Sequence, residues 1–184
     1  AYSEPDSRIG YLSRYAAGTR ENGGVYTHAA TWAIWAFALQ GQTELAFKVY
    51  QGISPIHNGM NPQRYLGEPY VTPGNIDGPD SDYYGRGGWT WYTGSAAWLD
   101  KMVSERILGI RPTRAGLVID PAIPAEWKQY SMTRKFRGTV YTINVTNPHN
   151  RSTGISELHV DGLIIQGNMI PPQHAKSCLV QVTM

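Results

Sequence analysis

One segment of the chain combines groups that bind anions. Between residues 85 and 95 it contains Arg86, a Gly87-Gly88 pair, and a Thr93-Gly94-Ser95 step at which a helix is predicted to begin. The first turn of a helix carries unpaired N–H groups and the positive end of the helix dipole, so it stabilises a phosphate placed there. The segment therefore predicts a candidate phosphate site. The alternative is a glycine-rich turn that only packs the helix.

His28 is a second candidate anion ligand. It lies one residue into another predicted helix, next to the polar loop of residues 21–24, so its imidazole and the N–H groups of that helix point the same way. A histidine at a helix start can also be a surface or capping residue. The other four histidines show no metal-ligand spacing and receive no role: His57, His149, His159 and His174.

Charged residues in two loops could act on a sugar. Arg20 and Glu21 are adjacent in a glycine-rich loop, which suits hydrogen bonding to hydroxyl groups, although a solvated pair is the alternative. Asp77, Asp80 and Asp82 form a cluster, and glycoside cleavage needs a carboxylic acid. The Gly-Pro step between the first two favours a turn in which Asp accepts local N–H groups instead.

Helices and then strands must position these groups. Residues 27–39 predict a helix that is apolar around its whole circumference and hence buried on all sides, and two more helices are predicted over 43–50 and 95–108. A long loop of residues 52–91 separates them. We expect residues 1–112 to be all-helical with long loops, and 113–184 to be part of an antiparallel β-sandwich. Its strands are expected over 117–119, 133–137, 139–146, 155–160, 163–165 and 178–182.

Composition limits the possible partners. The 184 residues include 12 Tyr and 6 Trp but 3 Phe, an excess that favours stacking on amphipathic partners such as sugars. A formal net charge of +2 without a Lys/Arg run predicts no nucleic-acid partner. Cys178 is the single cysteine, which excludes an internal disulfide and a thiolate metal cluster, and we expect it buried in a strand. No apolar run is long enough to cross a bilayer and no secretory pattern is present, so we expect no membrane partner and a cytoplasmic location.

Three motifs in register carry a family resemblance. They are Arg20-Glu-Asn-Gly-Gly-Val-Tyr-Thr-His28-Ala, Glu68-Pro-Tyr-Val71, and Gly85-Arg-Gly-Gly-Trp89 continuing through Trp91-Tyr-Thr-Gly-Ser-Ala-Ala-Trp98. In this order the chain resembles the C-terminal part of the inverting disaccharide phosphorylases of glycoside hydrolase family 94, such as cellobiose and cellobionic acid phosphorylases. The resemblance extends over essentially the whole chain.

The resemblance implies a fold and a reaction. The fold would be α+β: the C-terminal part of an (α/α)6 barrel over residues 1–112, then a small jelly-roll-like β-sandwich over 113–184. Inorganic phosphate, a substrate and not a cofactor, would cleave a β-linked gluco-disaccharide with inversion. The products would be α-glucose 1-phosphate and an acceptor sugar. No metal and no other cofactor are implied.

Site residues follow from the motifs. His28, Thr93 and Gly94 match phosphate ligands of the family, and Tyr15, Arg20 and Glu21 match positions close to the sugar subsites. The general acid Asp of the family lies upstream of these motifs, so the resemblance implies no catalytic acid in this chain and no turnover by it alone. We expect the N-terminal portion of the same enzyme as a partner chain, and a homodimer of the complete enzyme.

One departure from the family affects substrate choice. Gly74 stands where cellobiose and chitobiose phosphorylases carry a Gln, so donor-sugar contacts there must differ. Two rival functions stay open. One is a non-catalytic carbohydrate-binding or structural module with the aromatic residues as a stacking surface, and the other is an inverting glycoside hydrolase of related fold.

Overall fold

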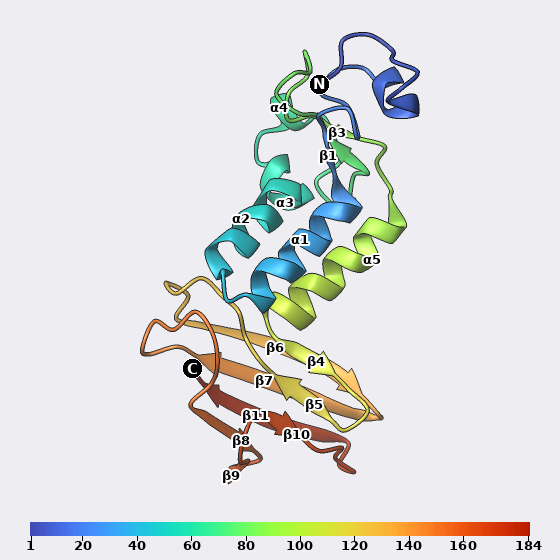
Figure 1. Ribbon diagram of the computed structural model, residues 1–184. Coiled ribbons are helices and arrows are strands. Elements are labelled where there is room, and N and C mark those ends of the chain that lie inside the picture. Colours follow the sequence, from blue (N-terminus) through green and yellow to red (C-terminus); the bar gives the residue numbers. More distant parts are fainter. The chain divides into compact units, whose positions relative to one another are not determined.

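The computed structural model describes residues 1–184, which divide into two compact units. The first unit comprises Ala1–Trp35 and Lys48–Asp100, and the second comprises Ala36–Phe47 and Lys101–Met184. Figure 1 traces the chain from an N-terminal region of loops and helices to a C-terminal region of strands. The fold is therefore α+β, with a β-rich C-terminal part as expected.

Helices dominate the first unit and its connections to the second. The expected helix over 27–39 is confirmed as α1, and the next helix extends three residues further than expected. The third begins at Thr93 instead of Ser95 and runs into a π-helical turn, η2, before Gly109, whose φ of +72° ends it. The helical elements are η1 (Gly10–Arg14), α1 (Thr27–Leu39), α2 (Thr43–Ile53), α3 (Pro55–Gly59), α4 (Pro62–Tyr65), α5 (Thr93–Met102) and η2 (Val103–Ile107).

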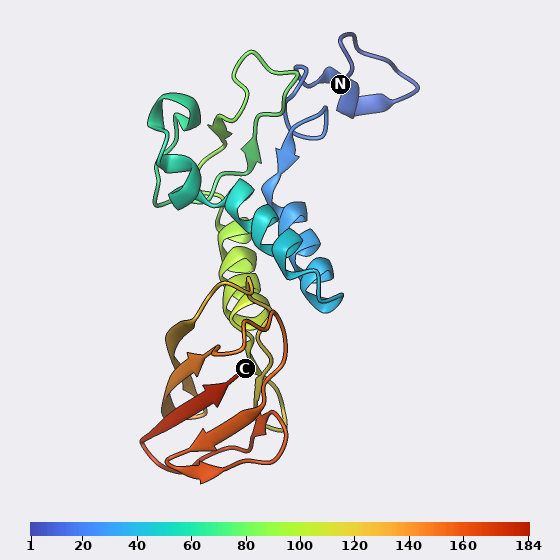
Figure 2. The ribbon, with the colours of Figure 1, turned by 90° about the vertical axis from the view of Figure 1, so that its left-hand side faces the viewer.

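A small antiparallel sheet orders the loops of the first unit. Its strands are β1 (Val25–Tyr26), β2 (Asn75–Ile76) and β3 (Gly87–Gly88), with β2 in the centre. The strand β1 leads directly into α1. Figures 1 and 2 both show the first turns of α1 and α5 next to this sheet. The sheet therefore holds together segments that are far apart in the sequence.

Two sheets form the second unit. A three-stranded sheet has the order β10-β5-β4, and a five-stranded sheet has the order β6-β7-β11-β8-β9. Burial alternates along β7, so that Tyr141, Ile143 and Val145 lie on one covered face. Cys178 is buried on the neighbouring β11, as expected. The strands are β4 (Ile110–Pro112), β5 (Leu117–Ile119), β6 (Gln129–Phe136), β7 (Thr139–Thr146), β8 (Glu157–Val160), β9 (Leu163–Ile164), β10 (Met169–Ile170) and β11 (Ser177–Thr183).

Four expectations are wrong. The segment 52–91 is not one long loop, because it contains α3, α4, β2 and β3, and residues 1–112 are therefore not all-helical. The five-stranded sheet is not wholly antiparallel, since β7 and β11 pair in parallel. The helix α1 is not covered on all sides, because the Trp32 side chain is 55% exposed. Short strands leave little periodic signal in a sequence, which explains the first two errors, and pairing between distant segments explains the third.

Candidate functional site

The start of α1 is fixed by the small sheet. Thr27 donates its backbone N–H to Gly74 O (3.1 Å) and its hydroxyl to Pro73 O (2.5 Å), and it is fully buried. Just before it, Tyr26 pairs with Asn75 across β1 and β2. The His28 side chain therefore extends from a well-anchored backbone in the first turn of the helix.

The start of α5 presents an open helix end. The first intrahelical hydrogen bond runs from Ala96 N–H to Tyr92 O (3.0 Å), so the helix ladder leaves the N–H groups of Thr93, Gly94 and Ser95 unpaired. Thr93 and Gly94 are exposed, and a Cβ added at Gly94 would meet nothing within 4 Å. This geometry is suited to an anion, because the partial charges point into accessible space.

Aromatic contacts bring the two helix starts together. The Tyr26 ring lies 6.2 Å from the His28 ring and 6.3 Å from the Tyr92 ring, between centroids. One turn into α5, the Trp98 ring lies 6.0 Å from the His28 ring. His28 and the first turn of α5 thus belong to one region of the first unit, although no direct hydrogen bond joins His28 to Thr93.

Unsatisfied polar atoms mark the same region. The Nε2 atom of His28 is buried without a hydrogen-bond partner. The hydroxyl of Ser95, in the first turn of α5, is also buried and unpartnered. A buried polar atom without a partner costs about 1–3 kcal/mol, so such atoms call for a ligand or another explanation.

Arg20 sits in a cage of three aromatic rings. Its guanidinium carbon lies 5.3 Å from the ring centroid of Tyr15, 5.5 Å from that of Tyr26 and 5.3 Å from that of Trp89. Arg20 Nε also lies 3.6 Å from the Glu21 carboxylate. The structure therefore assembles Tyr15, Arg20 and Glu21, and Tyr26 links this cluster to His28.

A buried polar network holds the Arg20 loop. Arg20 has a left-handed φ of +46°, and its N–H donates to the Asn75 side-chain oxygen at 2.7 Å. Asn75 in turn donates to Asp77 (2.8 Å), whose other oxygen pairs with Arg86 (2.9 Å). Asn75 and Asp77 are at most 1% exposed. Asp77 is thus committed to the network, which agrees with a structural role for this carboxylate.

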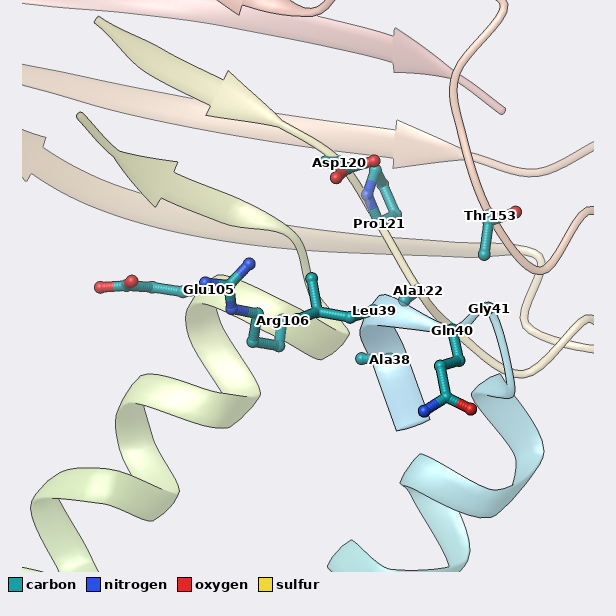
Figure 3. A pocket seen from close by; sticks show the side chains of 10 residues that line it. All are labelled: Ala38, Leu39, Gln40, Gly41, Glu105, Arg106, Asp120, Pro121, Ala122 and Thr153. Carbon is teal, nitrogen blue, oxygen red and sulfur yellow. The ribbon is translucent and has the colours of Figure 1, made fainter. Parts of the chain in front are cut away.

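The second unit contains a separate pocket of about 360 Å³. Figure 3 shows its lining, which comes from the end of α1, from η2 and from the loops that follow β5 and β7. One of its lining residues, the buried Glu105, is paired with Lys101 (3.0 Å) and Arg134 (3.5 Å). None of the expected site residues lines this pocket, so the candidate site remains the region between α1 and α5.

Sequence reasoning missed three residues of this region. Asn75 was not singled out, although a polar residue between apolar neighbours in a glycine-rich segment is a recognisable signal for a buried network. Tyr26 and Tyr92 both lie within the motifs that carry the resemblance, but neither was given a role. Only the fold shows that these two rings meet.

Comparisons with known proteins agree with the motifs. The catalytic domain of the glycosyl hydrolase 94 superfamily matches residues 1–109, and the C-terminal domain of glycosyl hydrolase family 65 matches residues 110–153. A cyclic β-(1,2)-glucan synthase of Rhizobium meliloti is 44% identical over 140 residues, which are 74% of this chain and 5% of that protein.

Two named phosphorylases are also similar. An N,N'-diacetylchitobiose phosphorylase of Vibrio proteolyticus is 35% identical over 173 residues, or 94% of this chain. A solabiose phosphorylase of Paenibacillus borealis is 33% identical over 171 residues, or 92% of this chain. The matched region is 22% of each of these relatives. No helix of the chain is long and apolar enough to cross a membrane. Because the catalytic-domain match covers more than half of its residues, the chain belongs to the glycosyl hydrolase 94 superfamily.

Proposed function

We propose that the first unit forms the phosphate side of the active site of an inverting glycoside phosphorylase. The observation that carries the proposal is the buried, unpartnered Nε2 of His28 beside the open first turn of α5. His28 would bind phosphate through its ring, Thr93 through its hydroxyl and Gly94 through its N–H. Two phosphorylases among the relatives support phosphorolysis as the reaction.

The reaction would transfer a glucosyl unit from a β-linked disaccharide to inorganic phosphate. Phosphate attacks the anomeric carbon in line, a carboxylic acid protonates the departing oxygen, and the products are α-glucose 1-phosphate and an acceptor sugar. Phosphate is already anionic at neutral pH, so no base has to activate it. The resemblance assigns the acid to no residue of this chain, and we expect the 184 residues alone not to turn over.

An inverting hydrolase is a weaker candidate. It would need two carboxyl groups about 6.5–9.5 Å apart, one of them free to activate water. Asp77 is buried and bonded to Asn75, Ser81 and Arg86, so it is not available for this task. An open helix end and an unpartnered imidazole favour an anion over water.

The sugar would lie on the Arg20 side of the site. Tyr15, Arg20 and Glu21 present a ring, a cation and a carboxylate, which together suit a ring face and hydroxyl groups. The exposed Trp32 on α1 supports the proposal that α1 and α5 are inner helices of an (α/α)6 barrel. The N-terminal portion of the enzyme would complete that barrel, and the complete cytoplasmic enzyme would be a homodimer.

A β-(1,2)-linked glucan is a second candidate substrate. The observation that favours it is the 44% identity to a cyclic β-(1,2)-glucan synthase, higher than the identities to the two phosphorylases above. The two substrates use the same phosphate site, so a panel of acceptors separates them.

The proposal is tested on the complete protein that carries this chain. Phosphate release is measured from α-glucose 1-phosphate with glucose, gluconate, N-acetylglucosamine and sophorose as acceptors. In the phosphorolytic direction, with the disaccharide that this panel identifies, His28→Ala should raise the KM for phosphate about 10- to 100-fold, the value of one hydrogen bond to a charged group. His174→Ala, at an exposed histidine of the second unit, is the matched control. Sugar binding without any phosphate dependence would favour the non-catalytic binding module.

A further inference from the structure

Tyr26 and Tyr92 form a pair of phenols at the centre of the candidate site. Tyr26 contacts the Arg20 guanidinium on one side and the His28 ring on the other. Tyr92 directly precedes Thr93 and packs edge-on against Tyr26 at 6.3 Å between centroids. The pair therefore lies where the sugar side and the phosphate side of the site meet.

The two hydroxyl groups have hydrogen-bonding capacity to spare. A side-chain hydrogen bond with Tyr92 is the main cause that raises the pKa of Tyr26. Each phenol can both donate and accept, so one bond between the two rings leaves one O–H donor and free oxygen lone pairs for another group. Both side chains are half-buried, which leaves them accessible to a ligand.

Tyr92 also fills the space beside Gly74. A Cβ added at Gly74 would lie 3.2–3.3 Å from three atoms of the Tyr92 ring, which is tighter than ordinary van der Waals contact. The backbone of Tyr92 is fixed by a hydrogen bond from its N–H to Thr72 O at 3.0 Å. A longer side chain at position 74 would therefore compete with the Tyr92 ring for the same space.

We propose that the Tyr26–Tyr92 pair is a specificity determinant that binds a hydroxyl group of the glycosyl unit next to the phosphate. The inference rests on the proposed function, because that function places phosphate at Thr93 and sugar at Arg20. The O–H of one phenol donates to the sugar hydroxyl, and the oxygen of the other phenol accepts from it. Gly74 has no side chain that could bind this hydroxyl, and the Tyr92 ring occupies the space beside it.

The test uses the complete enzyme in the synthetic direction. Tyr92→Phe and Tyr26→Phe are compared with the unaltered enzyme on α-glucose 1-phosphate and on its 2-, 3-, 4- and 6-deoxy analogues. Tyr84→Phe, at an exposed tyrosine of the same unit, is the control. Thermal melting verifies that each variant is folded.

We expect Tyr92→Phe to lower kcat/KM for α-glucose 1-phosphate about five- to tenfold, the net value of one neutral hydrogen bond. For the one deoxy analogue that lacks the bound hydroxyl group, Tyr92→Phe and the unaltered enzyme should have the same kcat/KM, because neither can make the contact with that analogue. If the tyrosines had a merely structural role, each deoxy analogue would lower kcat/KM by the same factor in both variants as in the unaltered enzyme. That result would overturn this inference but leave the proposed function standing. An unaltered enzyme without phosphate-dependent turnover would contradict the proposed function and this inference with it.

Discussion

Replacing Asn75 tests whether the buried network holds the Arg20 loop. Asn75→Ala removes the acceptor of the Arg20 N–H (2.7 Å) and one donor to the Asp77 carboxylate (2.8 Å), at a site that is 0% exposed. A neutral hydrogen bond contributes about 1 kcal/mol and one to a charged group about 1.5–3 kcal/mol, so the loss should be about 3 kcal/mol. This free energy corresponds to about a hundredfold increase in local opening.

Hydrogen exchange measures that opening in the complete protein. The amides of Asn22 and Gly24 should exchange about a hundredfold faster in Asn75→Ala, because they bond to Thr19 O and Arg20 O in the same loop. Asn75→Asp should increase the exchange rate further, since it places a second buried carboxylate beside Asp77. Asn144→Ala, at an exposed position of β7, is the control. Unchanged exchange in Asn75→Ala would refute the role of the network.

Three further results are expected. Gly24→Ala should lower the melting temperature strongly, because its Cβ would lie 2.5 Å from the Asn75 side-chain oxygen. In the control Gly52→Ala, in α2, the added Cβ meets nothing within 4 Å, so the melting temperature should stay the same or rise. Burial raises the pKa of Tyr65 from 10.0 to about 12, so its contribution to stability is present below pH 10 and is lost as the pH rises towards 12. Tyr65→Phe should abolish that loss without destabilising the fold at neutral pH, because the buried hydroxyl has no partner; an unaltered pH profile would contradict this explanation. Burial also raises the pKa of the Cys178 thiol, so iodoacetamide at pH 8 should label the folded protein far more slowly than the denatured one, as intact mass would show.

Local signals explain the parts of the fold that the sequence predicts correctly. The turns Arg137-Gly138 and Asp161-Gly162 have positive φ at both residues, as tight hairpins require, and each has glycine at its second position. The helix α1 follows from an alanine-rich, strongly apolar segment that ends at Leu39, before Gln40 and Gly41. Each of these elements is specified by residues that are neighbours in the chain.

Long-range pairing explains the parts that were not predicted. Strands of two residues, such as β2 and β3, are too short to show alternation. The parallel pairing of β7 with β11 joins residues more than 30 positions apart. The short helix α4 did leave a local signal, because the Asn61 side chain caps it and Pro62 occupies its first turn.

The candidate site divides in the same way. The motifs identified His28 and Thr93 as phosphate ligands and Arg20 as a sugar contact. These roles remain predictions. The meeting of Tyr26 with Tyr92, and the network from Arg20 through Asn75, depend on contacts between distant segments. Such contacts have no counterpart in the spacing of residues along one segment.

The most direct test of the central claim asks which nucleophile the complete enzyme uses. A β-linked disaccharide is incubated with and without inorganic phosphate, and the products are followed by phosphorus and proton magnetic resonance. We predict α-glucose 1-phosphate only when phosphate is present, with a much higher phosphate requirement in His28→Ala than in His174→Ala. Free glucose formed at the same rate without phosphate, or phosphorolysis unaffected by His28→Ala, would contradict the phosphate site proposed between α1 and α5.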